Sequence, residues 1–172
     1  MHPLWADFRA ALGQPEYLHV ILNPLPIYGL ATAVLGFGAA WIWGGRPAQA
    51  IALLLILLTA ASAGPVAHYG HQGYDRVYSL SDPPAQKWLN WHEHLGDRIV
   101  WIYYAAAGAA ALAVAALAGR PNLRRALFSL TLAAALSALA GGALMGFVGG
   151  KIRHAEFRDH APPAWADTSD NP

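Results

Sequence analysis

Histidine is the residue type of this chain best suited to chemistry: there are eight histidines and no cysteine. The imidazole ring binds iron, copper, nickel and zinc through nitrogen, and its charge changes near neutral pH. The lack of cysteine excludes disulfides, cysteine-held iron–sulfur clusters and covalent haem attachment. Metal or cofactor chemistry in this chain must therefore use nitrogen and oxygen ligands.

The candidate ligands lie at corresponding ends of four apolar segments. His19 precedes the first segment, His68 follows the second, His92 or His94 opens the third, and His154 follows the fourth. If consecutive segments are antiparallel helices, these four ends meet at one end of the bundle. We therefore expect the imidazoles to form a ring around a single ligand.

The fourth segment carries glycines at intervals of four, at Gly142, Gly146 and Gly150, and His154 continues the interval. Residues four apart share one helix face, and small residues there allow a neighbouring helix to approach closely. The stripe predicts helix packing, and it would also leave room for a flat macrocycle. We expect His154 to point into the bundle.

Two further histidine pairs leave alternatives open. His92 and His94 lie about 200° apart on a helix, so at most one faces the interior, and His92 is favoured because it shares a face with glycine and apolar residues. His68 and His71 share a face if the helix continues, and lie in a loop if it does not. With Asp75 they would supply a metal site of imidazoles and a carboxylate.

The elements that must position these residues are long and apolar. Of the 172 residues, 56% are hydrophobic and 12% are charged, against about 25% charged in an ordinary soluble domain. A helix needs about 20 apolar residues to cross a bilayer. Four stretches without a charged residue are that long or longer: residues 17–43, 47–74, 99–119 and 126–150. The pattern predicts an all-α integral membrane protein.

We divide the chain into an interfacial segment 1–16, a four-helix transmembrane domain 17–155 and a flexible tail 156–172. The expected spans are about 20–43, 48–67, 89–118 and 123–150, with a loop over 68–88. Short connections between consecutive helices predict an up-down-up-down bundle. The first helix is expected to begin near Pro24, or at Pro15–Tyr17 with a kink at the prolines.

Several sequence elements resemble a bacterial four-span membrane family known as domain of unknown function 2231. Residues 19–27, HVILNPLPI, match the frame of its opening motif, with Pro24 where the family has a second histidine. His92, Leu95 and Gly96 match the start of its third helix, and residues 149–154, GGKIRH, match the end of its fourth. The resemblance implies a fold like that of the di-haem cytochrome b bundles, in the bacterial inner membrane.

We expect a b-type haem protein of electron transfer, an accessory redox subunit rather than a stand-alone enzyme. His92 and His154 are the first-choice axial ligands, His19 and His68 come next, and Arg98 or Arg153 would pair with haem propionates. The alternatives are a Cu, Zn or Fe site and a structural subunit of a larger membrane complex. The metal candidates are His19, His68, His71, His92, His94 and His154.

The expected partners are the lipid bilayer, a quinone, and other redox subunits or further copies of this chain. A net charge of +1 and the lack of a basic stripe predict no nucleic-acid partner. The tightest basic cluster, Arg120–Arg125, lies in a short connection and favours termini on the periplasmic side.

Overall fold

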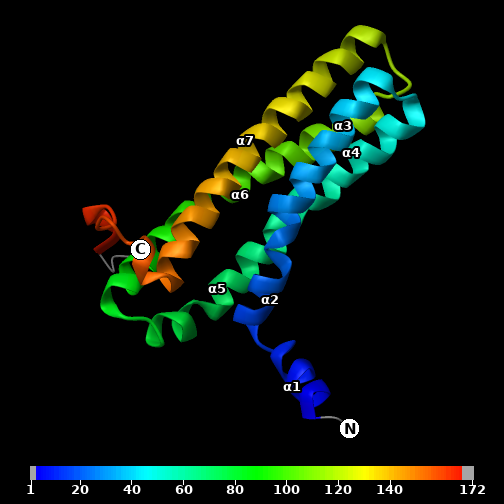
Figure 1. Ribbon diagram of the computed structural model, residues 1–172. Coiled ribbons are helices and arrows are strands. Elements are labelled where there is room, and N and C mark those ends of the chain that lie inside the picture. Colours follow the sequence, from blue (N-terminus) through cyan, green and yellow to red (C-terminus); the bar gives the residue numbers. More distant parts are fainter. Residues whose placement is uncertain (1–2, 168–172) are drawn as a thin grey trace.

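A computed structural model describes residues 3–167, and Figure 1 shows them as a bundle of long helices. Within this range every regular element is helical. The elements are α1 (Pro3–Ala11), α2 (Pro15–Leu22), a π-helical turn η1 (Leu25–Gly29), α3 (Leu30–Trp43), α4 (Arg46–Ala61), α5 (Ala63–Ser79), α6 (Pro83–Ala115), α7 (Pro121–Arg153), and two 3-10 turns, η2 (Ala155–Phe157) and η3 (Ala164–Asp167).

The described residues contain four helical stretches long and apolar enough to cross a membrane: Pro15–Trp43, Arg46–Ser79, Pro83–Ala115 and Pro121–Arg153. The prediction of an all-helical chain with four such helices is confirmed. Each stretch has 29 to 34 residues, which at a rise of 1.5 Å per residue is about 44–51 Å. All four are longer than the roughly 30 Å of a hydrocarbon layer, so their ends have room for polar residues.

The first stretch is broken where its prolines lie. Pro24 and Pro26 lack backbone N–H donors, so normal α-helical hydrogen bonds cannot form through this region. The chain adopts the π-helical turn η1 at Leu25–Gly29 between α2 and α3, an adjustment that often accompanies such breaks. The helix therefore begins at Pro15 and bends at the prolines, the second of the two expected arrangements.

The second stretch is broken at the same level. Helix α4 ends at Ala61 and α5 begins at Ala63, with Pro65 in the first turn of α5. The two breaks are neighbours, because a Cβ built on Gly29 of η1 would lie 3.0 Å from Cγ2 of Thr59. The first and second stretches therefore bend side by side.

These paired bends divide the bundle into two halves. In one half, α3, α4, α6 and α7 share a continuous core that includes the aromatic rings of Phe37, Trp41 and Phe128. In the other half, α2 packs on α5 while α6 and α7 remain packed on each other. Figure 1 shows α2 and α5 diverging from α6 and α7 below the bends.

The prediction of a loop over residues 68–88 was wrong, because α5 continues to Ser79 and only residues 80–82 connect it to α6. Two glycines of α5 have a low helix propensity, which by itself favours a loop. In the structure, however, α2 packs closely against both of them. A Cβ at Gly70 would meet the His19 ring, and a Cβ at Gly73 would lie 3.0 Å from the backbone of Glu16. Tertiary packing here outweighs the low helix propensity of glycine.

As far as residue 167, the segment expected to be a flexible tail contacts the helices. Arg158 donates two hydrogen bonds of 2.9 Å to the carboxylate of Asp82 and further bonds to the carbonyls of Lys151 and Ile152. Asn90 donates to the carbonyl of Ala166. The segment after α7 therefore folds back onto the start of α6. Residues 168–172 of the expected tail lie outside the described residues.

The attachment of this segment should depend on pH. Hydrogen bonds from Arg158 and from the Ala85 N–H lower the pKa of Asp82 below its ordinary value, which is about 3.9. The ionised carboxylate therefore stabilises the attachment above about pH 4, and this contribution is lost as the pH falls through the lowered folded-state value. A spin label on a single cysteine at exposed Ala161 should be immobile at neutral pH and mobile in acid.

The matched variant for this measurement is Arg158→Ala, which should leave the label mobile at every pH. A label that stays immobile in acid, or one that Arg158→Ala does not mobilise, would contradict the role given to the Asp82–Arg158 pair.

Candidate functional site

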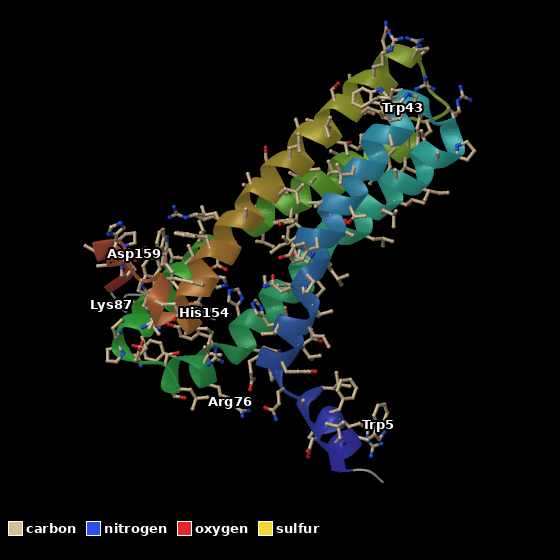
Figure 2. The ribbon with its side chains drawn as sticks, viewed as in Figure 1. Trp5, Trp43, Arg76, Lys87, His154 and Asp159 are labelled. Carbon is tan, nitrogen blue, oxygen red and sulfur yellow. The ribbon has the colours of Figure 1, made fainter. Side chains whose placement is uncertain are left out.

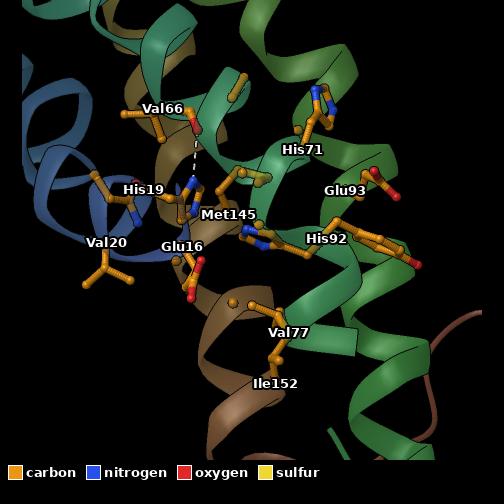
Figure 3. Close-up of a pocket in the computed structure, with 18 of the residues that line it drawn as sticks. Glu16, His19, Val20, Val66, His71, Val77, His92, Glu93, Met145 and Ile152 are labelled. Carbon is orange, nitrogen blue, oxygen red and sulfur yellow. Dashed lines mark hydrogen bonds between the residues drawn. The ribbon is translucent and has the colours of Figure 1, made fainter. Parts of the chain in front are cut away.

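A cavity of about 720 Å³ lies between the two helix pairs below the bends. One wall comes from α2, η1 and α5, and the other from α6 and α7 (Figure 3). Ligand pockets in proteins commonly have volumes of about 300–1,000 Å³. The cavity is therefore large enough for a cofactor or another organic ligand.

The cavity is elongated along the helices. Its lining on α6 runs from Leu89 to Tyr103, and on α5 from Ala63 to Val77. Fifteen residues of helix correspond to about 21 Å. Most lining side chains are apolar, among them Val66, Ile99 and Met145, so the site suits a long or flat ligand that is itself largely apolar.

His19 of α2 enters the cavity with its tautomer fixed. Its Nδ1 lies 2.8 Å from the carbonyl oxygen of Val66 on α5. A carbonyl can only accept a hydrogen bond, so Nδ1 carries the proton, and Nε2 of the neutral ring has a free lone pair. Histidines that ligate metals are typically held by such a bond from the other ring nitrogen.

His92 of α6 faces His19 across the cavity. The two ring centres are 6.4 Å apart and the ring planes are inclined at 81°. Nδ1 of His92 is buried and has no hydrogen-bond partner among the described residues, whereas the ring makes one hydrogen bond to the backbone of Met145. Burying a polar atom without a partner costs about 1–3 kcal/mol, so this nitrogen calls for a functional explanation.

Glycines give both imidazoles their space. A Cβ on Gly70 would lie 2.9 Å from Nδ1 of His19, and a Cβ on Gly149 would lie 3.1 Å from Cε1 of His92. On α7, Gly142 packs closely against Tyr103, whereas a Cβ on Gly146 would meet no atom within 4 Å. Of the predicted glycine stripe, Gly142 thus packs closely against α6, and Gly146 is an exposed cavity-lining position with open space around it.

The cavity mouth carries most of the charge. Glu16 pairs with Arg76 at 2.9 Å, and Asp97 accepts a hydrogen bond of 2.8 Å from Nε2 of His71. Glu93 and Arg153 also line the cavity. Arg153, one of the two arginines proposed to bind propionates, is therefore placed to meet an anionic group, while Arg98 is not among the lining residues.

His154 does not continue the glycine stripe, because α7 ends at Arg153 and His154 has an extended backbone. Its side chain is 53% exposed, stacks on Phe157 and bonds Glu156 through Nδ1. Figure 2 shows it at the end of α7, beside the C-terminal segment. The expectation that His154 points into the bundle was wrong, and the pair His92–His154 does not converge on the cavity.

The remaining histidines do not complete a ring. The His68 ring meets the Tyr69 ring edge to face, and its Nε2 lies 3.1 Å from Nε2 of Gln72. His71 lies at the mouth, and neither His68 nor His94 lines the cavity. Among residues 3–167, no group of three or more histidine or acidic side chains is arranged to hold a metal ion. The structure thus brings together His19 and His92 from the six candidates, with His71 at the entrance.

Two lining residues of chemical interest were not among the predicted site residues. The Tyr103 hydroxyl is buried without a partner in the described part of the chain, and Met145 carries a thioether close to the histidine pair (Figure 3). Tyr103 lies eleven residues after His92, three helical turns on the same face of α6. This spacing was the sequence feature that could have identified Tyr103 as a site residue. For Met145 the only such feature was its position beside the glycine stripe.

If His92 is retained for a ligand and not for folding, its removal should not harm the unloaded protein. His92→Leu should change the free energy of unfolding by no more than about 1 kcal/mol, because the removal of an unpaired buried nitrogen offsets the loss of the hydrogen bond to the Met145 backbone. The control Ile99→Ala, in the same helix and cavity wall, should lower it by about 2–5 kcal/mol. Thermal unfolding in detergent, followed by circular dichroism, measures both. An equal loss in the two variants would show that the imidazole is structural.

Comparisons of the chain with protein-family models, with curated proteins and with solved structures gave no match. The features of this chain that bear on function are the paired imidazoles, the cavity around them and the apolar surface of the helices.

Proposed function

We propose that this protein is a multi-pass membrane protein that binds haem b between His19 and His92 and transfers electrons. The observation that carries the proposal is the orientation of His19. Nδ1–H of His19 donates to the Val66 carbonyl, which leaves the lone pair of Nε2 free to bind a metal. The centre of this ring is 6.4 Å from the centre of the His92 ring. Haem in helical bundles is held by imidazoles in this way.

The surface supports placement in a membrane. Large apolar side chains point outward along all four long stretches; Leu35 is 77% exposed and Trp43 is 81% exposed. Others of this kind are Ile51, Leu58, Trp101, Leu130 and Phe147. A surface of this extent is unfavourable in water and is typical of contact with lipid. As part of the proposal, the helices form an up-down-up-down bundle in a bacterial inner membrane, with both termini on the periplasmic side.

The residues present fit a haem. Two imidazoles that bind one metal from opposite sides at about 2.0–2.1 Å have ring centres roughly 6 Å apart, close to the separation of His19 and His92. The unpaired Nδ1 of His92 and the space kept by Gly146 fit the same group. Haem needs only two protein ligands, so the lack of a three-ligand metal cluster in residues 3–167 does not bear against it.

Each residue then has a definite task. His19 and His92 would hold the iron, the Val66 carbonyl fixes the ring of His19, and Arg153 at the mouth would pair with a propionate. Bound haem would supply reversible one-electron oxidation and reduction. The apolar walls would limit the access of water to the iron, and a low local dielectric is one of the factors that set a haem potential.

The proposal keeps His92 from the first-choice ligand pair and replaces His154 with His19. The resemblance to domain of unknown function 2231 agrees with this choice, because the histidine of its opening motif corresponds to His19. A Cu or Zn ion remains a second hypothesis with weaker support, since only two imidazoles meet inside the cavity. A structural subunit without a cofactor is the outcome to expect if no ligand is found.

The ligand pair is tested by four single variants of the purified protein reconstituted with haem. His19→Ala and His92→Ala should each abolish the Soret band or convert it to that of a five-coordinate haem. His154→Ala and His68→Ala should leave the spectrum unchanged, because these rings lie outside the cavity. A spectrum that survives both of the first two variants would overturn the assignment of the ligands.

The cavity itself is tested by filling it. Gly146→Leu should be accommodated without a clash, because open space surrounds this position, and should reduce haem binding at least tenfold. Gly108→Leu is the matched control, since Gly108 also has open space around it but does not line the cavity. Absorbance titration with haem compares the two variants. Equal affinities would show that the ligand binds elsewhere.

A further inference from the structure

The inner end of the cavity holds a second unpaired polar group. Tyr103 is 4% exposed, lines the cavity, and its hydroxyl has no hydrogen-bond partner among the described residues. The hydroxyl lies against Gly142, where any added Cβ would collide with it, and Ile27 borders the same space. The absence of a side chain at Gly142 therefore leaves space for the Tyr103 hydroxyl, which has no hydrogen-bond partner among the described residues.

This hydroxyl is separate from the histidine pair. Tyr103 lies eleven residues beyond His92 on α6, which is about 16 Å along the helix. The side chains around it at this depth are apolar, including Ile27, Ile99 and Val100. The charged residues Glu16 and Glu93 line the cavity near the histidine pair, and Asp97 lies on α6 between His92 and Tyr103. An unpaired donor in apolar surroundings suits an uncharged ligand with a hydrogen-bond acceptor.

The cavity also has an apolar approach from the side. Val20 of α2 lines the cavity and is 66% exposed, and exposed Gly146 of α7 lines it as well. Helix α2 packs mainly on α5 and α7 mainly on α6. An apolar molecule dissolved in the bilayer can therefore enter between α2 and α7 without crossing the charged mouth.

We infer that the Tyr103 end of the cavity binds the ring of a membrane-soluble quinone, with the Tyr103 hydroxyl donating to a quinone carbonyl. A quinone is uncharged, is flat enough for a slot between helices, carries the required acceptor, and has an apolar tail that can remain among lipids. The inference rests on the proposed function in one respect: it supplies the redox partner of the haem held by His19 and His92. Binding of the quinone itself needs only the residues described here.

The test is binding of a benzoquinone with one isoprenoid unit to the detergent-solubilised protein, measured by calorimetry with and without added haem. Tyr103→Phe removes only the oxygen and should raise the dissociation constant roughly 3- to 10-fold, as expected for one lost neutral hydrogen bond. Tyr104→Phe is the matched control, because the Tyr104 hydroxyl lies against Gly64, and Tyr104 does not line the cavity. Circular dichroism verifies that both variants are folded.

Three results would overturn the inference: no saturable binding to the unaltered protein, equal affinities of the unaltered protein and Tyr103→Phe, or equal binding of an isoprenoid alcohol that lacks the quinone ring. The haem proposal fails independently, through the absence of a Soret band. In that case the dissociation constants measured without haem still decide whether Tyr103 binds a quinone.

Discussion

The arrangement of this protein depends on backbone hydrogen bonds that proline cannot make. Pro24 and Pro26 interrupt the first long stretch, and Pro65 lies directly after the break in the second. Because the contact of Gly29 with Thr59 holds these breaks at one level, α2 and α5 turn away from α6 and α7 together. Straight helices would pack along their whole length and leave no space. The cavity therefore follows from two coordinated bends.

The polar groups inside the cavity are energetically unfavourable unless a ligand satisfies them. Nδ1 of His92 and the hydroxyl of Tyr103 are both buried without partners in the described part of the chain. The surrounding glycines, which weaken a helix relative to alanine by about 1 kcal/mol each, leave space instead of filling it. Loss of stability concentrated in one place is typical of a binding site.

The cavity wall formed by α6 and α7 is held by more interactions than the wall formed by α2 and α5. Buried Lys151 of α7 donates to the carbonyl of Phe157 and lies 4.8 Å from the ring centres of Trp88 and Phe147. Arg158 ties the end of α7 to Asp82, the residue that caps α6. Helices α6 and α7 are thus clamped together where His92 lies. The wall of α2 and α5 has fewer contacts with the rest of the bundle, and is the one expected to yield when a ligand enters.

The sequence by itself determined the class of fold. Charge-free runs of more than 20 residues identify four apolar helices, because a charge inside such a run would be costly in lipid. It also determined that no metal or cofactor can be held by cysteine, since cysteine is absent. The place of His92, on the same face as Gly96, followed from helical periodicity alone.

Only the tertiary structure decided which histidines meet. The continuation of α5 through Gly70 depends on α2 packing against that glycine, and local propensity favours a loop there. His154 leaves the stripe because α7 ends one residue before it, within the uncertainty of any boundary predicted from sequence. His19 meets His92 because two helices bend at one level. The two bends lie in different segments of the chain, so no local sequence pattern predicts that they occur at the same level.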